Sequence, residues 1–136
     1  MPHLVATALA GAALAVLPII AAAPAGASTL PAPAAAASEL RLTLTYPGDD
    51  ASGTRTVTLT CAPDGGGHPA ARRACAELGA RGGAIEGEPA DTACVLIYAP
   101  VVAEVTGHWQ GTPVRFSRKY GNDCELHART GTVFRF

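Results

Sequence analysis

The sequence has little charge and few aromatic residues. Charged residues make up 15% and aromatic residues 5% of its 136 residues, and there is one Trp. Ten Lys and Arg stand against eleven Asp and Glu, which gives a formal net charge of −1. Because there is no basic excess to attract a polyanion, the composition favours neither nucleic acid nor an anionic membrane surface as a partner.

Catalytic motifs are also missing. The sequence contains no G-x-S-x-G, no H-E-x-x-H and no glycine-rich phosphate loop. His68, His108 and His127 have no recognised catalytic neighbours, and we interpret His68 as a helix-start or surface residue and His108 as a turn residue. Since an enzyme needs a nucleophile, a base and an orienting group within reach, the sequence predicts neither an enzyme nor a cofactor.

The N-terminal segment is apolar and uncharged. Residues 4–23 are almost wholly apolar, and small residues follow in an Ala-x-Ala pattern at 25–27, as in a secretory signal peptide. A membrane anchor is the alternative, but the run is rich in Ala and Gly, and no basic stop-transfer cluster follows it. We expect a signal peptide at 1–27, a flexible Pro- and Ala-rich arm at 28–38, one domain at 39–136, and a secreted, extracellular protein.

The sequence contains four cysteines: Cys61, Cys75, Cys94 and Cys124. No C-x-x-C or H-x-x-x-H spacing occurs, so the ligand pattern of a zinc site is absent and no metal is predicted. An even number of cysteines in a small exported chain is typical of disulfides. Two bridges are therefore predicted, and this count leaves all three pairings open.

Alternating apolar and polar residues predict two neighbouring antiparallel strands, 39–46 and 55–61. In the first of them Leu40, Leu42 and Leu44 would face the core. Two further strands, 101–105 and 113–120, flank a predicted wide turn at 107–111. A fifth, short strand is predicted at 131–136.

Helical segments are predicted at 69–78 and, for one or two turns, at 122–128. Pro69 is placed well to open the first helix, and Gly79 to end it. The glycine- and proline-containing stretch 81–92 predicts a long exposed loop. The predicted fold is therefore an α+β domain, in which a five-stranded antiparallel sheet carries one longer and one short helix on one face.

The segment 94–98 is suddenly apolar, with Val95, Leu96, Ile97 and Tyr98 following Cys94 and Pro100 close behind. A buried strand is one interpretation, because short apolar runs are ambiguous. The other is an exposed, extended peptide offered to a partner. The β-branched residues on both sides of Leu96 stiffen the backbone in the extended region, which suits this second interpretation.

Several spaced motifs carry a family resemblance: 57–63 (VTLTCAP), 67–71 (GHPAA), 74–76 (ACA), 98–100 (YAP), 109–111 (WQG), 122–125 (NDCE) and 133–136 (VFRF), together with Cys94. With these motifs the domain resembles the Streptomyces subtilisin inhibitor family of secreted serine protease inhibitors. The resemblance implies the pairings Cys61–Cys75 and Cys94–Cys124. It also implies homodimers joined through sheet faces.

The resemblance further implies a reactive bond between Leu96 and Ile97, so that Leu96 is P1, the residue before the bond that the protease attacks. Cys94, Val95, Tyr98 and Pro100 would flank this bond, and Val95 stands where the family often has Pro. The side chain of Asn122 would support the loop through its carbonyl groups.

An apolar P1 suits the binding pocket of subtilisins and of chymotrypsin-like enzymes, and it lacks the cation that trypsin binds. The sequence therefore predicts a secreted inhibitor of subtilisin-type proteases. The alternatives are a secreted binding module that keeps the fold without inhibiting, and a secreted hydrolase, which the missing catalytic constellation disfavours.

Overall fold

The computed structural model describes residues 36–48 and 53–136, which belong to the unit Pro33–Phe136. The predicted signal peptide and most of the predicted arm lie outside these residues. The elements follow the chain in the order β1 (Ser38–Tyr46), β2 (Gly53–Cys61), α1 (Ala71–Ala80), β3 (Val101–Trp109), β4 (Thr112–Tyr120) and α2 (Asp123–Thr130).

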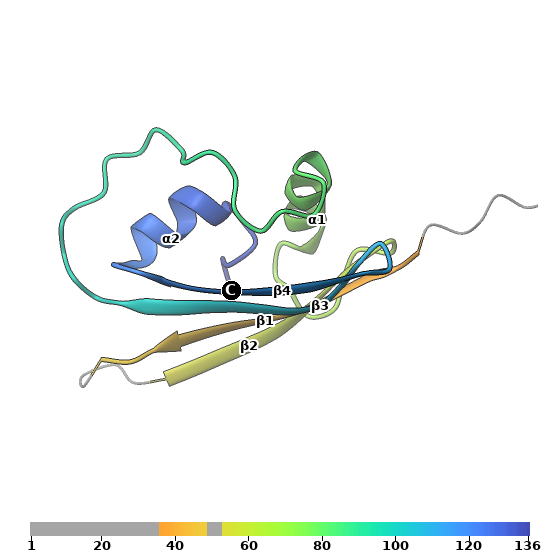
Figure 1. Cartoon of the computed structure of the whole chain (residues 1–136), viewed down its shortest axis with the longest axis horizontal. Helices are drawn as coiled ribbons and strands as arrows, with labels where there is room; N and C mark the ends of the chain where they lie inside the picture. Colours follow the sequence, from red (N-terminus) through yellow and green to blue (C-terminus); the bar gives the residue numbers. More distant parts are fainter. Residues whose placement is uncertain (1–35, 49–52) are drawn as a thin grey trace, which may run out of the picture. The chain divides into compact units, whose positions relative to one another are not determined.

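The strands form one antiparallel sheet in the order β2-β1-β3-β4. Both helices lie on the same side of this sheet (Figure 1). The α+β class with a longer and a shorter helix is confirmed, but the described residues contain four strands and not five.

The core lies between the sheet and the helices. Leu40, Leu42 and Leu44 are buried as the alternation predicts, and Leu59 of β2 lies directly across from Leu40. Threonines cover the opposite face of β1 and β2, where the hydroxyl oxygens of Thr43 and Thr56 lie 3.2 Å apart. A half-buried antiparallel sheet has this alternation because successive side chains point to opposite faces.

The predicted fifth strand at 131–136 is wrong. Val133 and Phe134 are adjacent and both are buried, which a strand with period-two alternation does not allow. This segment forms turns after α2, and Gly131 begins it with a φ of 64°. Apolar residues here contribute to the hydrophobic core instead of joining the sheet.

The predicted wide turn at 107–111 is also wrong. Trp109 pairs with Thr112, so only Gln110 and Gly111 form the turn, with φ values of 48° and 82°. Two positive φ values are the mark of a type I′ hairpin turn. Gly107 is a residue of β3, where a Cβ atom would collide with the carbonyl oxygen of Glu39. His108, predicted as a turn residue, is likewise part of β3.

The start of α1 also differs from the prediction. The helix begins at Ala71 and includes Gly79, while Pro69 precedes the N-cap residue Ala70. His68 is buried with 6% of its surface exposed, so it is not a surface residue. Its Nδ1 accepts a hydrogen bond from Ala70 N, and its Nε2 lies 3.0 Å from the carbonyl oxygen of Val133. The imidazole thus joins the start of α1 to the C-terminal segment.

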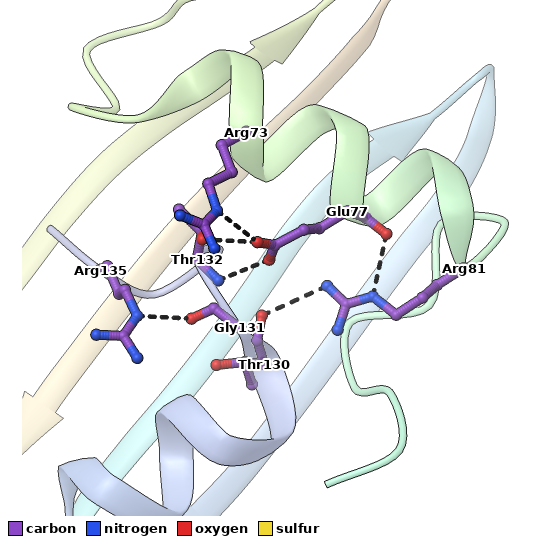
Figure 2. A network of polar contacts seen from close by, with 7 residues as sticks. All are labelled: Arg73, Glu77, Arg81, Thr130, Gly131, Thr132 and Arg135. Carbon is purple, nitrogen blue, oxygen red and sulfur yellow. Dashed lines mark hydrogen bonds and ion pairs between the residues drawn. The ribbon is translucent and has the colours of Figure 1, made fainter. Parts of the chain in front are cut away.

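Glu77 of α1 makes the second connection to the C-terminal segment (Figure 2). Its carboxylate accepts hydrogen bonds of 2.7 Å from both the backbone N–H and the hydroxyl of Thr132, and it pairs with Arg73 at 3.2 Å. Partial burial pushes the pKa of Glu77 up, but the hydrogen bonds from Thr132 and the charge of Arg73 outweigh it, so the pKa lies below the ordinary value. Arg81 continues the network to the carbonyl oxygen of Thr130 at 3.4 Å.

The connection from α1 to β3 is long, and in Figure 1 this green-to-cyan segment passes around α2 before it enters the sheet. It is not wholly exposed as predicted, because Ile85 is buried in the core. The backbone N–H groups of Gly87 and Ala90 donate to the carbonyl oxygens of Arg129 and Ala128 at the end of α2. The final residues of this connection form the candidate site.

Candidate functional site

The apolar segment after Cys94 lies outside the core. Residues 94–100 form neither helix nor strand, and the exposed fractions are 68% for Val95, 103% for Leu96, 64% for Ile97 and 72% for Tyr98. The interpretation as a buried strand is therefore wrong. Exposed apolar residues grouped in this way mark an interaction surface, because water-exposed apolar area is unfavourable unless a partner covers it.

A disulfide joins the start of this loop to α2. Cys94 is bonded to Cys124, and the two lie 30 residues apart in the sequence. The other bridge, Cys61–Cys75, fastens α1 to β2. Both pairings are those that the family resemblance implies. The described residues contain no free cysteine.

Asn122 holds the loop from both sides of Leu96. Its side-chain nitrogen donates to the carbonyl oxygens of Val95 at 3.3 Å and Ile97 at 2.9 Å. Its side-chain oxygen accepts from Glu125 N at 2.9 Å and so forms the N-cap of α2. The helix cap fixes which end of the amide faces the loop, because the oxygen is already bound to the helix.

Gly121 holds the residues that follow Leu96. Its carbonyl oxygen accepts from Ala99 N at 2.9 Å. Its own N–H donates to the carboxylate of Glu125, also at 2.9 Å. The ammonium of Lys119 lies 5.7 Å from the centre of the Tyr98 ring, within the range of a cation–π contact.

A further contact fastens the start of α2 to the sheet. The hydroxyl of Tyr46 donates to Asp123 at 3.1 Å and accepts from Arg55 at 3.3 Å. Burial and the negative charge of Asp123 raise the pKa of Tyr46, which keeps the phenol protonated as a donor. The turn that supports the loop is thus anchored to β1 as well as to the loop itself.

Among the residues that the structure describes, one group of potential metal ligands occurs, namely Cys61, Asp64 and Cys75. The two sulfurs are bonded to each other, so they are not the thiolates that a metal requires. His127 lies 3.3 Å from the carbonyl oxygen of Phe134, where burial and the charge of Arg135 lower its pKa.

Within 36–48 and 53–136, no helix is long and apolar enough to cross a membrane.

Comparison with known proteins identifies the family of this chain. The model of the subtilisin inhibitor-like family matches residues 36–122. The chain belongs to this family. Among curated members, the subtilisin inhibitor-like protein 5 of Streptomyces fradiae is 49% identical over 90 residues, which are 63% of this chain and 83% of that protein. The subtilisin inhibitor of Streptomyces albogriseolus is 46% identical over 91 residues, 63% of this chain and 62% of that protein.

Solved structures give the same result. This subtilisin inhibitor-like chain superimposes with a TM-score of 0.59 and 27% identity on a chain from the crystal structure of Streptomyces caespitosus sermetstatin in complex with Bacillus licheniformis subtilisin. The match covers 74% of this chain and 99% of that chain. Fold and family are therefore established together.

Of the residues singled out from the sequence, Cys94, Val95 and Ile97 all contact Asn122 or Cys124. Sequence reasoning missed Gly121, Glu125 and Lys119. The spacing of Asn122 and Glu125 was an available signal, since an N-cap residue followed three positions later by Glu is typical of a capping box.

Proposed function

We propose that this subtilisin inhibitor-like protein blocks serine proteases of the subtilisin type, with Leu96–Ile97 as the reactive bond. One observation carries the proposal: Leu96 is fully exposed, while one amide group holds the carbonyl oxygens of its two neighbours. A side chain displayed in this way on a fixed backbone is suited to fill a protease pocket. The family relationship supports the same assignment.

Binding then uses the loop as a substrate would. Leu96 enters the pocket for P1, and the backbone on either side pairs with the extended binding groove of the enzyme. Because the disulfide Cys94–Cys124 and the amide of Asn122 already hold the loop, little conformational entropy is lost on docking. Protease–inhibitor complexes of ordinary interface size are among the tightest known.

Cleavage is reversible in this mechanism. The serine oxygen of the protease attacks the carbonyl carbon of Leu96, the bond to Ile97 nitrogen breaks, and the serine proton is transferred to that nitrogen. An ester to the protease and a free amine on Ile97 result. The contacts from Asn122 to Ile97 and from Gly121 to Ala99 keep the amine beside the ester. The amine attacks the ester again before it can leave, and the peptide bond is restored.

The P1 residue sets the target. Leu96 fits the broad apolar pocket of subtilisins, and we extend the proposal to chymotrypsin-like enzymes, whose pocket is also apolar. Trypsin requires a cation to pair with its pocket carboxylate, which Leu96 does not supply. We expect tight inhibition of subtilisin and little inhibition of trypsin.

The test is a titration of subtilisin with the purified protein, followed by mass analysis of the mixture. Inhibition at about a one-to-one ratio, with slow cleavage only between Leu96 and Ile97, is the expected result. Rapid degradation, or no interaction at all, would instead favour a secreted binding module that keeps the fold without inhibiting.

Export is part of the same proposal. We propose a signal peptide at 1–27, an arm at 28–38, an inhibitory domain at 39–136 and an extracellular protein. The family match begins at 36 and β1 at Ser38, close to the proposed end of the arm. Mass analysis of the protein recovered from culture medium tests this, and a mature chain that still contains residues 1–27 would contradict it.

We also propose a homodimer joined through the outer face of the sheet. This face carries a depression of about 350 Å³ whose lining includes Arg41, Glu104 and Arg115. Charges of both signs allow a second copy, turned by a two-fold axis, to place an arginine against Glu104. Sedimentation equilibrium tests the dimer, and Glu104→Arg is expected to weaken it without changing subtilisin inhibition.

A further inference from the structure

The hydrogen bonds and the disulfide that hold the exposed loop all end on one short segment, 121–124. Gly121 accepts from Ala99, Asn122 donates to Val95 and Ile97, and Cys124 is bonded to Cys94. The two chain ends that cleavage after Leu96 would create are therefore held by the same few residues. What keeps this segment in place also keeps the two ends together.

Glu125 makes the contacts that fix this segment from the helix side. Its backbone N–H donates to the side chain of Asn122, and its carboxylate accepts from the N–H of Gly121. The usual capping box returns the carboxylate to the N-cap residue itself, whereas here it is bound one residue earlier. In this way the carboxylate holds the peptide group directly before the one that binds Ala99.

The backbone of Gly121 is closely fitted to this carboxylate. A Cβ atom at position 121 would lie 3.1 Å from Oε2 of Glu125, closer than ordinary van der Waals contact. The absence of a side chain at Gly121 thus lets the carboxylate approach its N–H. The short distance follows from the same hydrogen bond, in which Oε2 of Glu125 lies 2.9 Å from Gly121 N.

We propose that Glu125 is a positioning residue of the inhibitor, and that its carboxylate keeps segment 121–124 in the geometry that favours religation of the Leu96–Ile97 bond. Hydrolysis adds a hydroxyl from water to the Leu96 carbonyl carbon and a proton to Ile97 nitrogen, and religation releases that water. Loosening Gly121 gives the cleaved ends more freedom, so the equilibrium between cleaved and intact protein moves toward the cleaved form. This inference rests on the proposed function.

The test compares Glu125→Ala and Glu125→Gln with the wild-type protein, using catalytic amounts of subtilisin to bring cleaved and intact forms to equilibrium. Mass analysis then gives the ratio of the two forms. We expect Glu125→Ala to raise the cleaved-to-intact ratio roughly tenfold, equivalent to about 1.4 kcal/mol. Glu125→Gln keeps an oxygen acceptor for Gly121 N–H and is expected to restore most of the wild-type ratio.

Glu77→Ala is the control. It also removes a carboxylate that accepts a backbone N–H, but that N–H belongs to Thr132 and not to segment 121–124. We expect it to lower the melting temperature and leave the cleaved-to-intact ratio unchanged. Gly121→Ala keeps Glu125, but its Cβ atom would lie 3.1 Å from Oε2, so the carboxylate must shift by a few tenths of an ångström. It is expected to raise the ratio less than Glu125→Ala and covers the case in which Glu125→Ala does not fold.

The outcomes separate the two proposals. If wild-type protein does not inhibit subtilisin, or is cleaved elsewhere than after Leu96, the proposed function fails. If wild type behaves as proposed but Glu125→Ala and Gly121→Ala keep its ratio, the positioning role of Glu125 is overturned. The role is also overturned if Glu125→Gln is as impaired as Glu125→Ala, because charge would then explain the effect, or if Glu77→Ala raises the ratio equally, because a general loss of stability would then explain it.

Discussion

The side-chain amide of Asn122 both caps a helix and supports the loop. The substitutions Asn122→Asp and Asn122→Ala distinguish these two roles. Its oxygen caps α2 at Glu125 N, and its nitrogen holds Val95 and Ile97. Asn122→Asp keeps an oxygen acceptor for the cap, but it turns a carboxylate oxygen toward two carbonyl oxygens. Asn122→Ala removes both functions without adding a charge. The two variants are therefore expected to rank in opposite orders in stability and in inhibition.

The magnitudes follow from the bonds lost. An N-cap contributes about 1 kcal/mol, and each donated hydrogen bond contributes about 0.5–1.5 kcal/mol net. Both variants lose the two loop bonds, so inhibition of subtilisin weakens roughly 5- to 150-fold. Inhibition by Asn122→Asp is expected to be the weaker of the two, because the negative charge of its carboxylate repels the carbonyl oxygens of the loop. Because Asn122→Asp keeps the N-cap of α2, its melting temperature is expected to lie about 4–8 °C above that of Asn122→Ala.

Inhibition constants and thermal melts of the three proteins check this prediction. The expected order of stability is wild type, Asn122→Asp, Asn122→Ala, and the expected order of inhibition is wild type, Asn122→Ala, Asn122→Asp. If one variant were better in both measurements, cap and loop support would not be separable, and the two roles assigned to the amide would be refuted.

Three other substitutions test the site and the fold. Leu96→Lys supplies the cation that trypsin binds, so we expect trypsin inhibition to appear; unchanged inhibition constants for trypsin would show that Leu96 is not P1. Replacing both Cys94 and Cys124 by Ala opens a 30-residue separation, which costs roughly 3.6 kcal/mol. We expect earlier melting and faster cleavage by subtilisin, and equal cleavage rates would contradict the tethering role. The lowered pKa of Glu77 stabilises the fold above the unfolded value near 4.5, and this contribution is lost as pH falls through the lower folded value. Thermal melts should therefore separate Glu77→Gln from wild type at about pH 7, and the difference should shrink as pH falls below 4.5 through the lowered folded value; a constant gap would contradict this assignment.

The central strands could be predicted from the sequence because alternation reports directly which residues face the core. Leu40, Leu42 and Leu44 are buried as expected. The same rule failed at 131–136, where Val133 and Phe134 are buried in a turn whose Thr132 binds Glu77. Periodicity over so few residues does not distinguish a strand from a segment held by tertiary contacts.

Glycine was the other source of error. Gly107 was interpreted as a turn residue, but it is needed where β3 passes close to β1. A strand glycine of this kind marks close approach of another backbone, which only the sheet order reveals. The exposed loop was ambiguous for a similar reason, because its apolar side chains are explained by a partner outside the chain and not by this core.

The hydrogen bonds that support the exposed loop all end on its main chain. Val95, Leu96 and Ile97 are apolar, so hydrogen bonds reach only their backbone, and Asn122 binds carbonyl oxygens that every residue type possesses. Sequence variation at 95–97 therefore changes what is displayed and leaves the display itself intact. The domain therefore serves as a scaffold for engineering. Residues 95–97 can be varied in a library and selected against different proteases while the rest of the fold is kept.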